Sequence, residues 1–170
     1  MSIRTRNESK NRKSVNTEKK ARTYVTLSIG NELYAIDVMK VNTVSGLCEI
    51  RPVPNSKDFM KGVITVQDMI VPVIDMRKRF NLADTGVTKR TSIAIVSVKN
   101  RLIGLLVDAV SDVMDLEEMS VQDTPHFNNE IDEDCIEGIS RVNDRLVVIL
   151  NTDKIVSIDE IEKLSSEIND

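Results

Sequence analysis

The residues best suited to chemistry, one histidine and two cysteines, are too scattered to form a reactive site. His126 stands alone in a polar segment, and Cys48 and Cys135 fit no CxxC pattern. A structural zinc site needs about four protein ligands, and a His-assisted nucleophile would need a surrounding motif that this chain lacks. The two cysteines are therefore interpreted as free thiols in a reducing compartment.

The acidic run from Glu130 to Asp134 resembles a cation-binding loop only in its charge. It lacks the ligand spacing and the glycine of an EF-hand. No glycine-rich phosphate loop appears among the six glycines of the chain. We interpret the run as a solvated loop, and the sequence predicts no enzyme, no metal site, no cofactor and no small-molecule substrate.

Charge divides the chain into a basic tail and an acidic body. Residues 1–22 contain eight Lys or Arg and two Glu, whereas the remaining 148 residues contain fifteen basic and twenty-five acidic side chains. The tail lacks periodic apolar residues, so we expect it to be disordered. Neither a secretory leader nor a membrane-spanning run is recognisable, which favours a cytoplasmic protein.

A basic tail can also attract nucleic acid. A small barrel that binds nucleic acid usually has a basic face with stacking aromatic residues, but this body is acidic and only 3% of the chain is aromatic. Nucleic-acid binding through the tail stays as the alternative from another functional class.

Two blocks of the sequence repeat without a gap. Residues 24–44 align with residues 93–113 at a constant offset of 69 residues, and residues 62–75 align with residues 138–151 at an offset of 76 residues. Turn residues keep their register, so we expect Ser28 to superpose on Ser97 and Asn31 on Asn100. Two copies are too few for a solenoid, which needs about three or more units. The repeat predicts two small β subdomains with one common plan.

Local patterns predict strands in both copies and few helices. Val25, Leu27 and Ile29 alternate with polar residues, which is the two-residue period of a half-buried strand. Short strands separated by turn signals indicate an all-β barrel or sandwich. Asp75 is positioned to cap a short helical turn. Ser157 and Glu160 have the spacing of a capping box at the start of a terminal helix.

The chain resembles CheW-type coupling proteins, the adaptors of bacterial chemotaxis. The resemblance rests on GVITVQDMIVPVIDMRKRF, YAIDVMKV, IGLLVDAVSDV and the lead-in FMKG, and it covers roughly Tyr24 to Ile158. It implies an all-β fold of two pseudo-symmetric, SH3-like five-stranded barrels. The expected organisation is a disordered basic tail (1–22), a CheW-like domain with two interleaved barrel subdomains (23–156) and a short C-terminal helix (157–170).

The resemblance also implies a function. A CheW-type protein is a non-enzymatic scaffold that bridges the cytoplasmic tips of chemoreceptors (methyl-accepting chemotaxis proteins) and the regulatory domain of the histidine kinase CheA. Such a protein would be cytoplasmic and recruited to membrane chemoreceptor arrays. In the family the receptor tip lies in an apolar groove between the barrels. The matching receptor-binding positions here are Val38, Val41, Thr43, Val44, Gln67, Ile103 and Gly104. The expected kinase-binding positions are Leu47, Ile50, Val53 and Lys61.

One departure from the family concerns two of these positions. The family usually has Glu where Thr43 stands and Arg where Gln67 stands, and in familiar members the two form an ion pair. An exposed ion pair contributes only about 0–1 kcal/mol, so its loss should not harm the fold, but rim charges set partner choice. We expect Thr43 and Gln67 still to face each other through a neutral contact. A specialised paralogue that joins receptor arrays with a different kinase, or with none, is the alternative within the family.

Overall fold

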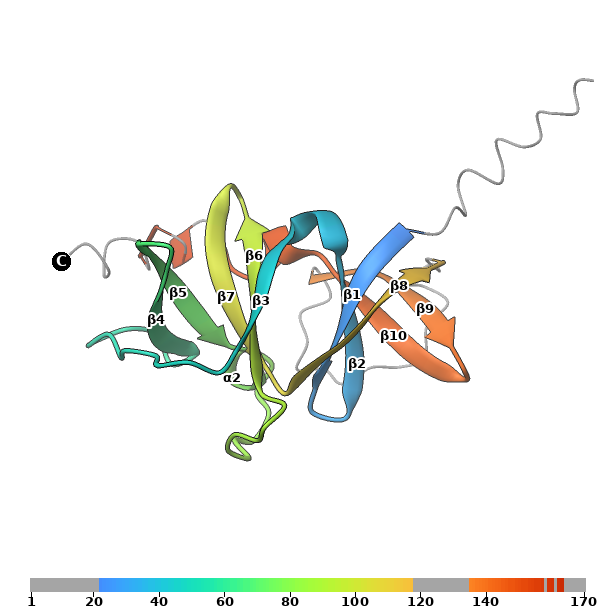
Figure 1. The fold of residues 1–170 in the computed structure, drawn as a ribbon, viewed down its shortest axis with the longest axis horizontal. Coiled ribbons are helices and arrows are strands. Elements are labelled where there is room, and N and C mark those ends of the chain that lie inside the picture. Colours follow the sequence, from blue (N-terminus) through green and yellow to red (C-terminus); the bar gives the residue numbers. More distant parts are fainter. Residues whose placement is uncertain (1–21, 118–134, 158, 161, 164–170) are drawn as a thin grey trace, which may run out of the picture.

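The structure, a computed structural model, describes residues 22–117, 135–157, 159–160 and 162–163. Ten strands dominate these residues, and the helical segments are short (Figure 1). The strands are β1 (Arg22–Ile29), β2 (Glu32–Asp37), β3 (Val41–Gly46), β4 (Met60–Val66), β5 (Met69–Asp75), β6 (Ser92–Val98), β7 (Arg101–Val107), β8 (Ala109–Leu116), β9 (Ile136–Val142) and β10 (Arg145–Leu150). The helical segments are η1 (Val38–Lys40), α2 (Met76–Arg79) and η4 (Thr152–Lys154).

The strands form two five-stranded sheets whose orders correspond strand for strand. One sheet has the order β8-β1-β2-β10-β9 and the other has the order β3-β6-β7-β5-β4. The sequence repeat relates β1 to β6, β2 to β7, β3 to β8, β4 to β9 and β5 to β10, and under this correspondence the two orders are the same. The prediction of an all-β fold with two pseudo-symmetric barrels is therefore confirmed.

Each barrel is assembled from both halves of the chain. The β1–β2 hairpin of the first half pairs with β8 and β10 of the second half, and the β6–β7 hairpin pairs with β3 and β5 of the first half. A contiguous half of the sequence is thus not a barrel by itself. Equivalent residues do take equivalent places: Ser28 is opposite Leu33, and Ser97 is opposite Leu102.

The largest core cluster lies between the two sheets. It combines Leu27 and Ile36 of one sheet with Val96, Ile103 and other buried residues of the second sheet. A smaller cluster fills each barrel, one around Ile64 and Ile95 and one around Tyr24 and Ile149. Because the main core needs side chains from both sheets, the two barrels form one packed body (Figure 1).

The hairpin turns use residues that tolerate positive φ. Both central residues have φ between 49° and 68° in the Gln67–Asp68, Lys99–Asn100 and Asn143–Asp144 turns. These are the positive φ values of type I′ turns, which match the right-handed twist of the paired strands. In the Gly30–Asn31 turn the positive φ, 65°, belongs to Gly30.

The expected caps are present. The Asp75 carboxylate accepts hydrogen bonds from the backbone N–H groups of Arg77 (3.0 Å) and Lys78 (3.4 Å) at the start of α2. Ser157 N–H donates to Glu160 Oε1 (2.8 Å) and Glu160 N–H donates to Ser157 Oγ (3.1 Å). These are the two reciprocal bonds of a capping box. Residues 159, 160, 162 and 163 are helical.

Three sequence predictions fall largely on residues outside the described part of the chain. Of the expected tail, only Arg22 is described, and it is the first residue of β1 rather than tail. His126 and the acidic run 130–134 lie outside the described residues, as does most of the expected terminal helix. Among the described residues, none belongs to a helix that is long and apolar enough to cross a membrane.

Candidate functional site: an apolar surface where the barrels meet

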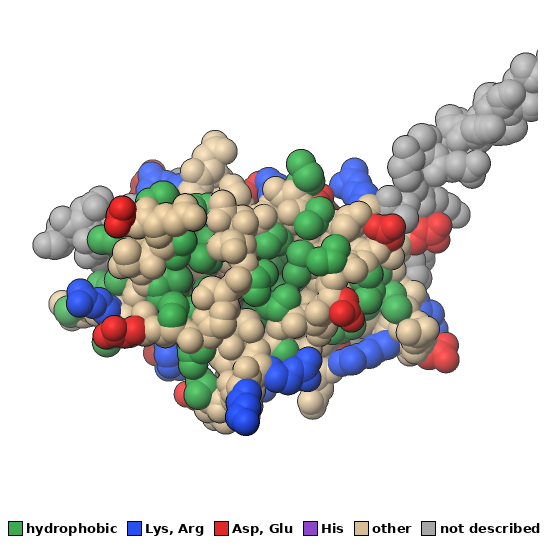
Figure 2. All heavy atoms as spheres, in the orientation of Figure 1, with side chains coloured by type: hydrophobic (Ala, Val, Ile, Leu, Met, Phe, Trp, Pro, Cys, Tyr) green, Lys and Arg blue, Asp and Glu red, His purple; other side chains and the backbone are tan. Residues whose placement is uncertain are grey.

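The edge strands β3 and β8 carry an apolar surface where the main core reaches the outside. Val41 on β3 and Val110 on β8 are both partly buried and pack against the main core. Further along the same strands, Val44 is 43% exposed and Val113 is 63% exposed. Figure 2 shows hydrophobic side chains gathered across the middle of this face. We call these four valines the central apolar surface.

The two pairs of valines are equivalent in the repeat. The offset of 69 residues places Val41 over Val110 and Val44 over Val113, and their strand partners Ala94 and Val25 are equivalent too. The central apolar surface therefore has two equivalent sides, one from each copy of the sequence repeat. Sequence reasoning named only the β3 side, although the repeat itself held the signal for the β8 side. Contiguous apolar patches mark interaction sites more often than single exposed apolar residues do, so these four valines are a candidate docking surface.

Two of the expected receptor-binding residues are not available on the surface. Ile103 is 2% exposed and belongs to the main core. Gly104 is buried, and a Cβ built on it would lie 3.0 Å from Ile93 Cγ2 and 3.3 Å from Val73 Cγ2. Both lie in β7, a central strand that is covered on both faces. A partner docked on this structure could not contact the Ile103 side chain without opening the core.

Other expected receptor-binding residues are at least partly exposed to solvent. Val38 is half-buried in η1, and Thr43 is exposed on β3. Gln67 is exposed in the β4–β5 turn with φ of 49°. Among the described residues, no hydrogen bond links the Thr43 hydroxyl to the Gln67 amide, so a neutral contact between the two residues stays a prediction.

The expected kinase-binding residues lie in one segment and the strand that follows it. Leu47 is exposed, Ile50 and Val53 are half-buried, and Lys61 is exposed on β4. Ile50 packs against the core of its barrel. Backbone hydrogen bonds join Arg51 and Val63 in both directions, at 2.9 and 2.8 Å, and fasten the segment against β4. This gives a second apolar surface, distinct from the central one.

A partly buried ion pair joins the two barrels. Arg77 donates from Nε to Asp108 Oδ1 (2.9 Å) and from Nη2 to Asp108 Oδ2 (2.8 Å), a bidentate arrangement. The hydrogen bonds to Asp108 are the main reason why the pKa of Arg77 is raised above the ordinary value of an arginine. Gly30 N–H in the β1–β2 turn also donates to Asp108 Oδ2 (2.9 Å). We call Arg77 and Asp108 the junction pair.

A second ion pair partly mirrors the junction pair, although its basic residue, Lys40, lies one position past Met39, which is the equivalent of Asp108 in the repeat. Asp153, which the second block of the repeat places at the position of Arg77, lies 3.5 Å from Lys40 Nζ. Asp153 also accepts a hydrogen bond from Lys99 N–H, the turn residue equivalent to Gly30. This outer pair is more exposed than the junction pair. Sequence reasoning missed both pairs, because their partners are distant in the chain.

The described residues include both cysteines and side chains of the kinds that can hold a metal ion. Within them, no three His, Cys, Asp or Glu residues are arranged to hold a metal ion. Cys48 is exposed and Cys135 is buried, and no disulfide joins them. The Cys135 thiol donates to the Lys154 carbonyl (3.1 Å).

Comparison with known proteins identifies the class of protein to which this chain is similar. The family model described as the CheW-like domain matches residues 23–160. The chemotaxis protein CheW of Klebsiella aerogenes is 28% identical over 138 residues, which cover 81% of this chain and 83% of that protein. The chemotaxis protein CheW of Bacillus subtilis is 27% identical over 132 residues, covering 78% and 85%.

A solved structure gives the same result. The crystal structure of the scaffolding protein TtCheW from Thermoanaerobacter tengcongensis matches with a TM-score of 0.73 and 31% sequence identity, covering 82% of this chain and 90% of that chain. The class is thus a non-catalytic chemotaxis scaffold. This chain belongs to the CheW-like family.

Proposed function

We propose that this protein couples the cytoplasmic tips of chemoreceptors to the regulatory domain of the histidine kinase CheA, and that it acts in the cytoplasm at receptor arrays. The proposal rests on family membership together with two separate apolar surfaces on one body. An adaptor needs two such surfaces, because it must hold two partners at once without competition between them.

The receptor tip is assigned to the central apolar surface. Val44 and Val113 are exposed at 43% and 63%, and Val41 and Val110 connect them to the main core. A helical hairpin with apolar residues along one side could bury all four valines. Burial of apolar area contributes about 25 cal/mol per Å², so this surface can supply much of the binding free energy. Thr43, which is adjacent to Val44 on β3, then acts as a neutral residue at its edge.

The kinase is assigned to the segment from Leu47 to Lys61. Leu47 is 43% exposed, and Ile50 and Val53 are partly accessible beside it. The backbone bonds between Arg51 and Val63 hold these side chains in place, which reduces the entropy lost on binding. The exposed ammonium of Lys61 adds a rim charge that favours an acidic partner.

Pairwise capture tests the proposal. The immobilised full-length protein is incubated separately with a receptor cytoplasmic fragment and with the CheA regulatory domain. We expect both to be retained, and deletion of residues 1–21 should leave both interactions intact. Retention of the receptor fragment alone would favour the specialised paralogue, which the neutral Thr43 and Gln67 also suggest. Retention of neither would refute the proposal.

A further inference from the structure

An apolar residue of β5 is accessible on the side of the second sheet that forms the main core. Along β5, Val71 and Val73 belong to the cluster inside their barrel, whereas Ile74 belongs to the main core. Successive side chains of a strand alternate between its two faces, so Ile70 lies on the same face as Ile74. Ile70 is 56% exposed. The described residues therefore leave this face open at the beginning of β5.

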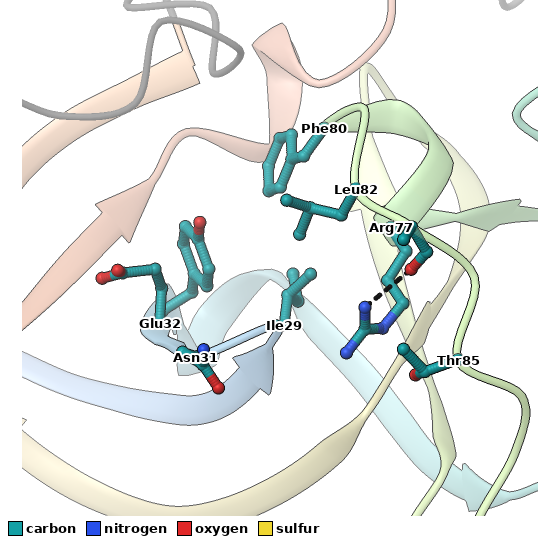
Figure 3. Close-up of a pocket in the computed structure, with 10 residues that line it drawn as sticks. Ile29, Asn31, Glu32, Arg77, Phe80, Leu82 and Thr85 are labelled. Carbon is teal, nitrogen blue, oxygen red and sulfur yellow. Dashed lines mark hydrogen bonds between the residues drawn. The ribbon is translucent and has the colours of Figure 1, made fainter.

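Elsewhere on the main core, large apolar side chains cover one another. Figure 3 shows Ile29, Phe80 and Leu82 next to one another, where the β1–β2 turn faces the segment after α2. Ile29 is 0% exposed and Phe80 is 2% exposed, so this part of the core is already filled. The face at Ile70 differs, because it continues from the packed core and yet remains accessible.

The chain that leads to the C-terminal helix is packed into the same core. Ile155 and Val156 are both buried in the main core. Arg79 Nε donates to the Ile155 carbonyl (2.8 Å), and Lys99 Nζ donates to the Val156 carbonyl (3.5 Å). The helix that follows Ser157 therefore starts from a fixed point beside the β6–β7 turn.

The sequence of the C-terminal segment predicts a helix with one apolar side. The described helical residues 159, 160, 162 and 163 are all charged, and their side chains are exposed or half-buried. Apolar residues recur at helical spacing in the same segment, and these are Ile158, Ile161, Leu164 and Ile168. A helix shorter than about 12–15 residues is only marginally stable in water on its own. Its stability therefore depends on a surface that covers the apolar side.

The helix is long enough to reach Ile70. In the order of the sheet, β5 is two strands away from β6, which is about 10 Å at the usual strand spacing. β5 and β7 are parallel, so β5 begins at the end of the sheet where the β6–β7 turn leads into β7. Leu164 is seven residues beyond Ser157, or about 10 Å along a helix. A helix that crosses the sheet from the β6–β7 turn thus brings this position to β5.

We propose that the apolar side of the C-terminal helix docks on the main-core face of β5, with Leu164 over Ile70. This segment has an advantage over any separate partner, because a tethered segment acts at an effective concentration in the millimolar range. The docking site is distinct from both surfaces assigned to protein partners. β3 is at the far edge of the sheet, and Ile50 packs against the barrel interior on the other face. The docked helix is therefore a property beyond the adaptor function.

Hydrogen exchange of the whole chain, followed by mass spectrometry, tests the docking. A synthetic peptide of residues 157–170 provides the exchange rate of the free segment, since a helix of this length is marginal on its own. In the protein, we expect the backbone amides of residues 161–168 to exchange at least about tenfold more slowly than in the peptide. Exchange at the rate of the peptide would overturn the proposal.

Two substitutions remove the contact from either side. Ile70→Ser changes the surface and Leu164→Ser changes the helix, and each should speed the exchange of residues 161–168 about tenfold. The β1–β2 hairpin should keep its protection in both variants, which shows that the fold is intact. Met69→Ser is the matched control, because Met69 is 50% exposed but alternates with Ile70 and so faces the barrel interior.

Two results of the variants would overturn the proposal. The first is an equal effect of Met69→Ser and Ile70→Ser on the exchange of the C-terminal segment. The second is a concentration-dependent dimer, seen by sedimentation, that Ile70→Ser abolishes without changing the exchange of this segment. A second copy of the chain would then be the occupant of the β5 face.

Discussion

Replacing Gly62 with alanine puts a methyl group where the backbone of another segment already lies. Gly62 has φ of 151°, in a region that side chains rarely adopt. A Cβ at this position would be 2.8 Å from the Arg51 carbonyl carbon and 2.9 Å from Ile50 Cγ2, and closer still to the Arg51 carbonyl oxygen. The same oxygen accepts the hydrogen bond from Val63 N–H (2.8 Å) that fastens the segment to β4.

The expected cost has two parts. A strained backbone conformation costs about 1–3 kcal/mol, and overpacking against neighbours costs about 1–3 kcal/mol. The Arg51 carbonyl is backbone and cannot rotate away, so the clash is relieved only by moving the segment. We therefore expect Gly62→Ala to lower the free energy of unfolding by about 4 kcal/mol. At about 3–4 °C per kcal/mol for a domain of this size, the melting temperature should fall by about 12–16 °C.

Gly46→Ala is the matched control. Nothing lies within 4 Å of a Cβ built on Gly46, and its φ is not in the positive range. A glycine replaced at a compatible site is neutral or stabilises by about 0.4–1 kcal/mol, because the unfolded chain loses freedom. Urea unfolding of the two variants and the parent, followed by circular dichroism, measures the difference. A Gly62→Ala variant within about 1 kcal/mol of the parent would refute the reasoning.

The same variant has a functional consequence under the proposed function. Moving the segment around Ile50 and Arg51 displaces the proposed kinase surface, whereas the central apolar surface on β3 and β8 is elsewhere. At a temperature where Gly62→Ala remains folded, affinity for the CheA regulatory domain should fall more than affinity for a receptor fragment. Equal losses would place the kinase surface elsewhere.

Three further predictions follow from the pairs and the surface. A double-mutant cycle with Arg77→Ala and Asp108→Ala should give a coupling free energy of about 1–2 kcal/mol, since the pair is bidentate and partly buried. The exposed outer pair should give about 0–0.5 kcal/mol, and equal values would contradict this account. Val44→Asp should weaken receptor capture at least about tenfold while the unfolding free energy changes by no more than about 0.5 kcal/mol; undiminished capture would remove β3 from the contact surface. Thr43→Glu and Gln67→Arg should each weaken capture of the protein's own receptor and recover affinity together, whereas strictly additive effects would mean that the two positions do not interact.

Sequence patterns were sufficient to predict the features that depend only on residues close together in the sequence. The alternation around Val25 and Leu27, the turn residues and the Ser157 capping box each depend on neighbours within a few positions. The repeat also predicted which strands are equivalent. It could not predict which copy supplies each strand, because pairing within a half and pairing between halves satisfy the same backbone groups and bury the same side-chain faces.

The candidate functional site was harder to predict, because it depends on contacts between residues that are far apart in the sequence. Ile103 reads as one apolar residue of a strand, and only the packing of the second sheet over β7 shows that it is buried. Arg77 and Asp108 are 31 residues apart and follow no periodic pattern. Val113, in contrast, was within reach of the sequence, since the repeat relates it to Val44.

Co-sedimentation tests the central claim most directly. Membranes that contain chemoreceptors are mixed with CheA, with and without the full-length protein, and the pelleted CheA is measured. If the protein is an adaptor between receptor and kinase, CheA should pellet above background only when the protein is present, and Val44→Asp should abolish the increase. Pelleted CheA that is the same with and without the protein would contradict the account.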